Sequence, residues 1–325
     1  MKRPHWQNDL YRDKKYLLDR NETCDPEFST HLRSFLNALP IETLTTYPSM
    51  SKAYNSLIKL ASVPGKNLFL TSGSEQGIKT ILENNISIKK LVFPEPTFKM
   101  VEVYANLLYF DYEKMPYRYE FNKFDIDLNF NSDAIIYIAS PDNPTGFSFG
   151  SSFVEQLCQT HPLVILDEAY SPHAAARCKL IEKYDNLYIV RTFSKFGSAA
   201  GLRIGYIISA ENNINRLYMH KPMYELSNIA VEYLHYMSNN IDLLQKSTEN
   251  IANGKQKLEG WLRSMNCKVV NYVTGNFVLF ERNDTLTSKI KEYVAYKNVE
   301  VDGKEFTRIT APSVDCVNDI ITYAT

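Results

Sequence analysis

The stretch from about residue 65 to 210 alternates short apolar runs with helix-like segments, and this alternation constrains the fold more than any other feature. Several runs are apolar at both odd and even positions, which is typical of parallel strands covered on both faces. Strands that alternate with helices predict a doubly wound α/β sheet. We expect helices at 75–84 and 153–159, and strands at 67–71, 90–93, 134–139, 163–166, 187–191 and 204–209.

The C-terminal third has a different pattern. Apolar residues recur at steps of three and four from Ile241 to Met265, which predicts a long amphipathic helix. We expect a strand over 268–280, a helix near 288–296, a strand at 306–310 and a final helix. These elements would form a smaller α+β unit, on which the first 30 residues are expected to pack. The predicted division is a large domain of residues 31–215 and a small domain of residues 1–30 and 216–325.

Composition and charge exclude several classes of protein. A net charge of −1 gives no field that favours nucleic acid or an anionic membrane. The first residues are not followed by an apolar stretch, so neither a signal peptide nor a membrane span is expected. Five dispersed cysteines without a C-x-x-C indicate reduced thiols and a cytoplasmic location. Six dispersed histidines offer no metal-ligand spacing, so no metal is expected.

The first chemical signal is the run V-I-L-D-E-A-Y, which ends a predicted strand and places Asp167 just outside the sheet. Open α/β sheets bind ligands at the carboxyl ends of their strands. An apolar run before Asp-Glu also occurs in P-loop ATPases, but these need a G-x-x-x-x-G-K-[ST] loop. The Gly-Lys pairs of this chain are followed by Asn, Gln and Glu, which argues against that class. A helix-capping role for Asp167 remains open at this point.

A second signal follows the strand at 187–191 and combines Thr192, Ser194, Lys195 and Arg203 with small residues. Hydroxyl groups and an arginine can bind a phosphate dianion, the arginine through its planar fork. Lys195 is a candidate for chemistry, although a lone lysine is more often a solvated surface residue.

Two further segments follow predicted strands. The sequence S-P-D-N-P-T-G at 140–146 is by itself typical of a turn. The sequence T-S-G-S-E at 71–75 leads from a strand into a helix, where free backbone amides can bind an anion. Alone, each of these signals is weak.

In this order, the four segments resemble the aminotransferase class I/II family, and most closely its histidinol-phosphate aminotransferase branch. The specific matches are N-P-T-G at 143–146, D-E-A-Y at 167–170, and S-K at 194–195 with Arg203 eight residues on. Y-P at 47–48 and P-E-P-T-F at 94–98 also match. The resemblance covers nearly the whole chain. It implies the α/β fold of fold-type I pyridoxal-phosphate transferases, with a mostly parallel, seven-stranded-type sheet and a smaller α+β domain.

The resemblance implies pyridoxal 5'-phosphate as cofactor. Lys195 should form the Schiff base with it and, once released, act as the base that moves the α-proton. Asp167 should keep the pyridine nitrogen protonated, which makes the ring an electron sink. Asn143 and Tyr170 should bond the phenolic oxygen, and Phe98 should stack on the ring.

The remaining contacts are implied in the same way. The phosphate should be held by Ser74, Glu75, Thr192, Ser194 and Arg203. Tyr47 should reach the phosphate from the neighbouring subunit, which implies a homodimer with shared sites. Arg308, in T-R-I-T at 307–310, should clamp the substrate α-carboxylate. Asn21, in the pair Asn-Glu at 21–22, should line the substrate side of the site.

The implied reaction is transfer of an amino group from an amino acid, with glutamate expected, to a small oxo acceptor that is phosphorylated in some relatives. Histidinol-phosphate aminotransferases carry a second arginine upstream of the carboxylate clamp, whereas residues 299–305 contain only Lys304 as a cation. This difference argues against histidinol phosphate as the substrate. A decarboxylase of phosphorylated amino acids is the alternative, because the motifs do not fix substrate orientation. A non-catalytic cofactor-binding regulator is more remote, because the chain is not basic.

Overall fold

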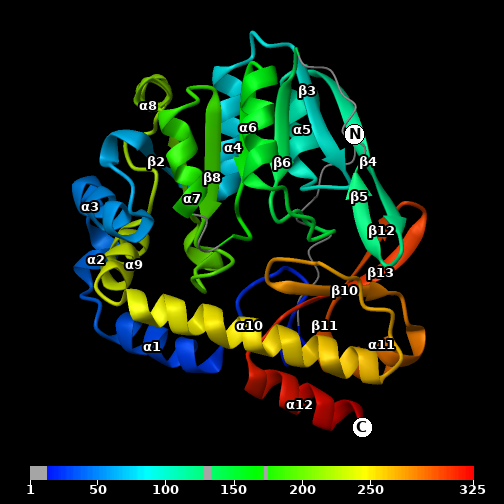
Figure 1. Cartoon of the computed structure of the whole chain (residues 1–325). Helices are drawn as coiled ribbons and strands as arrows, with labels where there is room; N and C mark the ends of the chain where they lie inside the picture. Colours follow the sequence, from blue (N-terminus) through cyan, green and yellow to red (C-terminus); the bar gives the residue numbers. More distant parts are fainter. Residues whose placement is uncertain (1–12, 127–132, 172–174) are drawn as a thin grey trace.

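The computed structural model describes residues 13–126, 133–171 and 175–325. One large sheet with helices lies above a smaller α+β unit, and the long helix α10 (Ile241–Ser264) runs below the large sheet into the smaller unit, where it packs against α12 (Val314–Ala324) and β10 (Phe277–Glu281) (Figure 1). Among the described residues, no helix is both long and apolar enough to cross a membrane.

The large sheet has eight strands in the described part of the chain, in the order β2-β9-β8-β7-β6-β3-β4-β5. Neighbouring strands from β4 through β3, β6 and β7 to β8 are parallel, whereas β9 is antiparallel to β2 and β8, and β5 is antiparallel to β4. The α/β prediction is therefore confirmed, and β4 and β5 are added to the six strands expected from the sequence. The strands are β2 (Leu68–Ser72), β3 (Lys90–Glu95), β4 (Asp111–Glu120), β5 (Lys123–Ile126), β6 (Ile135–Ala139), β7 (Leu163–Asp167), β8 (Leu187–Thr192) and β9 (Ile204–Ser209).

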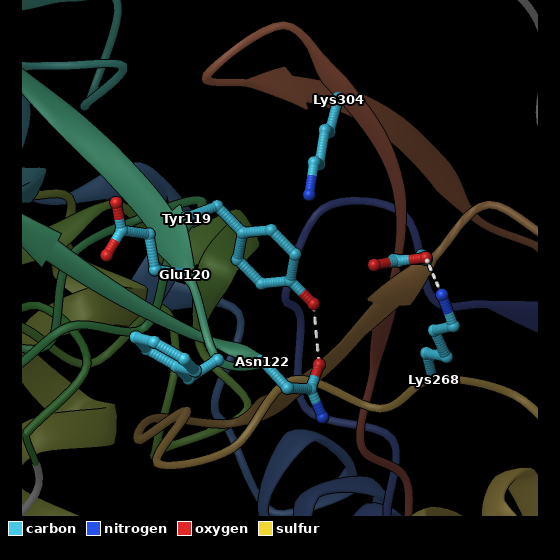
Figure 2. Close-up of a pocket in the computed structure, with 7 residues that line it drawn as sticks. Tyr119, Glu120, Asn122, Lys268 and Lys304 are labelled. Carbon is cyan, nitrogen blue, oxygen red and sulfur yellow. Dashed lines mark hydrogen bonds and ion pairs between the residues drawn. The ribbon is translucent and has the colours of Figure 1, made fainter.

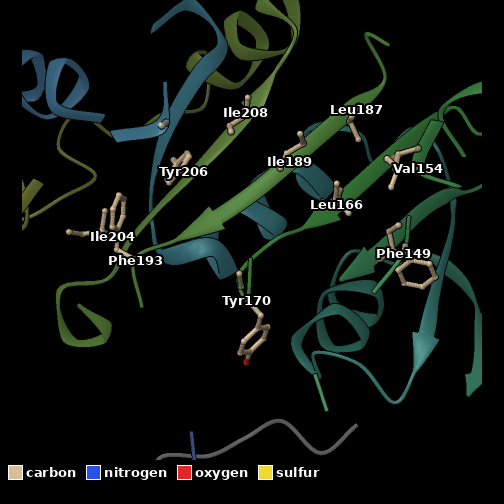
Figure 3. Close-up of a cluster of buried hydrophobic side chains, with 14 of the residues drawn as sticks. Phe149, Val154, Leu166, Tyr170, Leu187, Ile189, Phe193, Ile204, Tyr206 and Ile208 are labelled. Atoms are coloured by element: carbon tan, nitrogen blue, oxygen red, sulfur yellow. The ribbon is translucent and has the colours of Figure 1, made fainter. Parts of the chain in front are cut away.

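Both faces of the central strands are buried, as their unbroken apolar sequences predict. Because successive side chains point to opposite faces, Leu166 and Ile189 join one core cluster, while Ile165 and Val190 join the other. Figure 3 shows the first cluster, with Tyr170 lying beyond the strand residues. The sheet is flanked by α4 (Gly73–Asn84), α5 (Met100–Leu107), α6 (Ser151–Thr160), α7 (Ala175–Cys178) and α8 (Glu211–Tyr218).

The smaller unit contains an antiparallel sheet of β10 (Phe277–Glu281), β13 (Lys304–Thr310) and β12 (Lys297–Val301), in that order. It also contains α11 (Asp284–Ile290) and α12 (Val314–Ala324). Residues 13–25, here called the N-terminal strap, pack on this unit. Within the strap, β1 (Tyr16–Leu17) pairs in parallel with β11 (Val294–Ala295). The expected packing of the N-terminus on the small unit is thus confirmed for the strap; residues 1–12 lie outside the described residues.

Two predicted elements of this unit were wrong. The strand expected over 268–280 is limited to Phe277–Glu281, because Tyr272 and Gly275 adopt positive φ angles of 59° and 86° that interrupt an extended chain. The helix expected near 288–296 begins and ends earlier. The Asn283 side chain caps it by accepting a bond from the Leu286 amide, and Val294 then pairs with the strap.

The remaining helices link the two parts of the chain. They are α1 (Pro26–Asn37), α2 (Glu42–Thr45), α3 (Met50–Ala61) and α9 (Asn228–Ser238), with short 3-10 turns at Gly65–Asn67, Lys179–Glu182 and Ala200–Leu202. Lys52 on α3 forms an ion pair of 2.6 Å with Glu232 on α9. Because α9 belongs to the predicted small domain and α3 to the large one, the bounds 31–215 against 1–30 and 216–325 stay a prediction.

The β4–β5 hairpin also joins the large sheet to the smaller unit. The Tyr119 amide donates to Asp302 Oδ2 at 2.9 Å, and the Tyr119 ring packs edge-on against Phe306. Figure 2 shows a surface pocket at this junction, where Lys304 Nζ lies 4.7 Å from the centre of the Tyr119 ring. Lys304 therefore belongs to the hairpin junction.

Candidate active site

A cavity of about 560 Å³ lies where the large sheet faces the strap and the β12–β13 hairpin. Its sheet side consists of residues that directly follow β6, β7 and β8, together with the first turn of α4. The polar and aromatic residues that line it include Asp19, Arg20, Ser74, Phe98, Asp142, Asn143, Asp167, Tyr170, Lys195, Lys297 and Arg308.

Lys195 lies in the loop after β8, with its amine in this cavity. Its Nζ donates to the Arg20 carbonyl at 2.8 Å and lies 5.7 Å from the centre of the Tyr170 ring. Burial, helped by the positive charge of Arg308, lowers the pKa of Lys195 to about 8. A lysine with so low a pKa is partly neutral near physiological pH, as a nucleophile or base must be.

Asp167 ends β7 and is buried beneath the cavity. It accepts hydrogen bonds from the Tyr137 hydroxyl at 2.8 Å and the Ala169 amide at 2.9 Å. Burial raises the pKa of Asp167 to about 6. A buried carboxylate whose ionised form is disfavoured gains from a cation brought by a ligand.

The neighbouring Glu168 has a different role. Its carboxylate is buried and pairs with Arg191 at 2.7 Å and Arg177 at 3.2 Å. The Asp-Glu pair of the sequence thus divides into a carboxylate that faces the cavity and one that is part of a buried ion-pair network. This separation excludes Glu168 from the cavity chemistry.

Residues from distant parts of the chain are joined by hydrogen bonds around the cavity. The Tyr170 hydroxyl accepts a bond of 3.1 Å from Asn21 Nδ2. Arg308 donates to Asn143 Oδ1 and, at 2.6 Å, to the Asp19 carbonyl. Its Nε is buried and has no hydrogen-bond partner among the described residues. Such an orphaned donor fits an anionic group supplied by a ligand.

Two glycines allow close approaches at the first turn of α4. Gly73 has a φ of +81°, and a Cβ there would lie 2.5 Å from Nη2 of Arg203. A Cβ on Gly205 would lie 2.5 Å from the Ser74 nitrogen. The two glycines therefore allow the arginine and β9 to approach the amides that begin α4. Arg203, these amides and nearby hydroxyls form a donor set that fits a phosphate.

The side chains of the other predicted phosphate ligands form hydrogen bonds within the protein. Thr192 Oγ1 lies 3.0 Å from Ser194 Oγ and also bonds the Ile204 carbonyl. The Glu75 side chain accepts a hydrogen bond from the Tyr104 hydroxyl at 2.8 Å. The candidate phosphate ligand of this residue is therefore its backbone amide. Of the predicted phosphate ligands, Ser74 lines the cavity, whereas Glu75, Thr192, Ser194 and Arg203 are not among the described residues that line it.

Tyr47 is not brought to the cavity of its own chain. It is 80% exposed and stacks on Tyr224, with ring centres 4.6 Å apart. This position agrees with the expectation that its contact is made in a neighbouring subunit, which the single chain does not test.

Among the lining residues that the sequence did not single out, two bear most on the chemistry. Lys297 is the cross-strand partner of Arg308 in the β12–β13 ladder, and the surrounding protein, together with Arg308, lowers its pKa. A second substrate-binding cation was expected within residues 299–305, where Lys304 is the candidate. The structure places Lys304 at the hairpin junction instead. The antiparallel register would have identified Lys297, but that register was not known from the sequence.

Asp142 is the other missed residue. It is fully buried, accepts from Tyr117 at 2.6 Å and Thr97 at 2.7 Å, and burial raises its pKa to about 7. The signal was a carboxylate directly after a buried strand, which the turn-like sequence around it concealed.

Comparison with known proteins agrees with this geometry. A sequence model of the family described as aminotransferase class I and II matches residues 15–318. Histidinol-phosphate aminotransferase from Caldanaerobacter subterraneus subsp. tengcongensis is 28% identical, covering 95% of this chain and 92% of that one.

Two solved structures have a similar fold. Histidinol-phosphate aminotransferase from Sinorhizobium meliloti, in complex with pyridoxal-5'-phosphate, superimposes with a TM-score of 0.77 at 19% identity, covering 96% of this chain and 90% of that one. L-threonine-O-3-phosphate decarboxylase from Porphyromonas gingivalis gives a TM-score of 0.74 at 18% identity, covering 95% and 98%. The family match spans almost the whole chain, and Lys195 and Asp167 both line the cavity at the carboxyl ends of the parallel strands. The chain therefore belongs to the aminotransferase class I and II family and is a pyridoxal-phosphate-dependent aminotransferase.

Proposed function

We propose that this enzyme takes the amino group of an amino acid, glutamate in the first place, and passes it to a small oxo acceptor that carries a second anionic group. The observation that carries this proposal is the pair of cations Arg308 and Lys297, side by side on adjacent strands at the substrate end of the cavity. Two anionic groups on one small molecule would match these two cations.

The cofactor residues have separate tasks in this proposal. Pyridoxal phosphate, when bound, supplies an electron sink and a carrier for the amino group. Lys195 holds the cofactor covalently and, when displaced by substrate, moves a proton at the substrate α-carbon. The lowered pKa of Lys195 supports this role. Asp167 pairs with the ring nitrogen, while Asn143 and Tyr170 bond the phenolic oxygen and Phe98 stacks on the ring.

The phosphate of the cofactor would bind at the first turn of α4, beside Gly73. Its ligands would be the amides of Ser74 and Glu75, the hydroxyl groups of Thr192 and Ser194, and the guanidinium of Arg203. Support comes from the two glycines that bring Arg203 to the start of α4.

Arg308 would bind the substrate α-carboxylate. Its Nε is the orphaned buried donor of the cavity, and its other bonds go to an amide oxygen and a carbonyl rather than to a carboxylate. A substrate carboxylate can replace these neutral acceptors, because charged partners form stronger hydrogen bonds. Asn21 would order the strap above the substrate through Tyr170.

Lys297 would receive the second anionic group, with Arg20 at the cavity edge. A lysine binds phosphate or carboxylate as a point charge and without the bidentate geometry of arginine. The site therefore fits a small phosphorylated or dicarboxylic acceptor, and it differs from the two-arginine arrangement that the family resemblance led us to seek.

The enzyme would act as a homodimer in the cytoplasm. Large apolar side chains are exposed together around α2 and the segment between α8 and α9, where Tyr47 stacks on Tyr224. An apolar patch of this kind is typical of a protein interface. The exposed residues are Ile41, Leu44, Tyr47, Met219, Met223 and Tyr224.

The test is an absorbance spectrum of the purified protein with pyridoxal phosphate, before and after L-glutamate. Conversion of the lysine-bound cofactor to its amine form, seen as a shift to shorter wavelength, is the expected result. Lys195→Ala should abolish the lysine-bound band. Lys255→Met is the matched control, because Lys255 is also buried with a pKa lowered to about 8 but does not line the cavity. Release of carbon dioxide without cofactor conversion would instead support decarboxylation.

A further inference from the structure

A pair of thiols joins the N-terminal strap to the last helix. Cys24 lies near the end of the strap, and Cys316 lies in the first turn of α12, 292 residues later in the chain. Their sulfur atoms are 3.9 Å apart. The Ser313 amide, at the cap of α12, donates to the Cys24 carbonyl at 2.9 Å, which holds the two backbones in register.

The surroundings of Cys316 stabilise a thiolate. The hydrogen bond from Cys24 lowers the pKa of Cys316 to about 6, and Ser313 and Tyr16 act in the same direction. The first turn of a helix also favours a negative charge. Burial instead raises the pKa of Cys158, Cys178 and Cys267. The pKa of Cys316 is thus lowered, whereas the pKa values of these three thiols are raised.

A small reagent can approach the pair. Cys316 is only 2% exposed, but Cys24 is partly exposed and lines a pocket of about 740 Å³. Tyr16, which contacts Cys316, lines the same pocket. The pocket is distinct from the active-site cavity, and neither cysteine is needed for the proposed amino transfer.

We propose that Cys24 and Cys316 form an oxidation site, which a peroxide converts into a disulfide that fastens the strap to α12. The Cys316 thiolate attacks one peroxide oxygen, the O–O bond breaks, and hydrogen peroxide leaves a sulfenic acid and hydroxide. The Cys24 thiol then attacks that sulfur, the S–O bond breaks, and water is released. In total, two thiols and one hydrogen peroxide give one disulfide and two waters.

Formation of the bond requires the sulfur atoms to approach from 3.9 Å to the disulfide length of about 2.05 Å. The backbone bond from Ser313 to Cys24 already keeps the two segments next to each other. The strap also contacts the active site: Thr23 Oγ1 donates to the Lys195 carbonyl at 2.9 Å, and Asp19 and Asn21 contact Arg308 and Tyr170. Fastening the strap therefore acts on groups that surround the substrate.

The first experiment treats the intact protein, saturated with pyridoxal phosphate, with a few equivalents of hydrogen peroxide. We expect the number of titratable thiols in the unfolded protein to fall from the five of the sequence to three. Peptide mapping should show a cross-link between the peptides that contain Cys24 and Cys316, and a reductant should reverse it. Retention of five thiols, or a cross-link between other cysteines, would overturn the proposal.

Hydrogen exchange tests the fastening itself and does not depend on catalysis. Amides 16–24 should exchange at least several-fold more slowly after oxidation. Cys24→Ser and Cys316→Ser should each abolish both the cross-link and this slowing, whereas Cys158→Ser should preserve them. If the disulfide forms in the parent protein without slowing exchange in the strap, the fastening role is wrong. These outcomes do not require the enzyme to use any particular substrate, so they separate this proposal from the one above.

Discussion

The side of the cavity that would hold the cofactor and the side that would hold the substrate are built in different ways. We call them the cofactor wall (Asn143, Asp167, Tyr170 and Lys195) and the substrate wall (Asp19, Arg20, Lys297 and Arg308). Every residue of the cofactor wall lies within a few positions of the end of a parallel strand. The substrate wall combines chain segments up to 289 residues apart, joined partly through backbone carbonyl groups.

This difference suggests that the two walls control different properties of the enzyme, its rate and its choice of substrate. The register of β6 and β7, in which Ala139 pairs with Asp167, places the cofactor residues through main-chain hydrogen bonds of the sheet. The strap and the β12–β13 hairpin lie outside the large sheet, so their residues can change without altering its register. We therefore expect the cofactor wall to determine the rate of the chemical step and the substrate wall to determine which molecule binds.

The largest effect is expected at the cofactor wall. Asp167→Asn should lower kcat by about 10²–10³-fold, because it removes a charge aimed at the reacting group. The free energy of unfolding should change little, because burial already makes the ionised form of Asp167 unfavourable. Asp142→Asn is the matched control, since it removes another buried carboxylate beside the cavity. Similar kcat losses in the two variants would contradict a special role of Asp167 in the chemical step.

Arg308→Gln tests the substrate wall. It should raise KM for the carboxylate substrate by about 10–100-fold, the value of a charged hydrogen bond, while kcat changes less. Steady-state kinetics with varied amino donor would measure this division. Arg282→Gln, which removes an exposed arginine paired with Glu305 in the same unit, should leave KM unchanged. A loss confined to kcat would place Arg308 in the chemical step and would contradict the proposed division of tasks between the two walls.

A smaller effect is expected where the two walls meet. Asn21→Ala removes one neutral hydrogen bond to the Tyr170 hydroxyl, so kcat/KM should fall by about 2–10-fold. Tyr170→Phe removes the other partner of the same bond. If the bond acts as one unit, the double variant should lose less than the product of the two single losses. Independent losses would show that Asn21 acts through the strap alone.

The smallest expected effect is a shift in a pH profile. Burial lowers the pKa of Lys195 to about 8, so protein freed of cofactor should bond pyridoxal phosphate faster as pH rises from 7 to 9. The amine is increasingly neutral over that range. Arg308→Gln removes a nearby positive charge and should move the midpoint upward by up to about one unit. Stopped-flow absorbance would measure it, and a midpoint near the ordinary lysine value of 10.5 would contradict the burial of this amine.

By itself, the sequence predicted six of the eight strands described in the large sheet and, through the family resemblance, the residues of the cofactor wall. The apolar runs of β6, β7 and β8 needed no tertiary context, because strands buried on both faces are unbroken in the sequence, and the polar residues of the site follow them directly. The expected strand over 268–280 and helix over 288–296 failed, because left-handed residues and pairing with the strap decide the structure there. Only the tertiary structure placed Lys297 beside Arg308, Lys304 at the β4–β5 junction and Cys24 against Cys316. These contacts depend on the register of the β12–β13 hairpin and on the meeting of the two chain ends, and neither leaves a periodic signal in the amino-acid sequence.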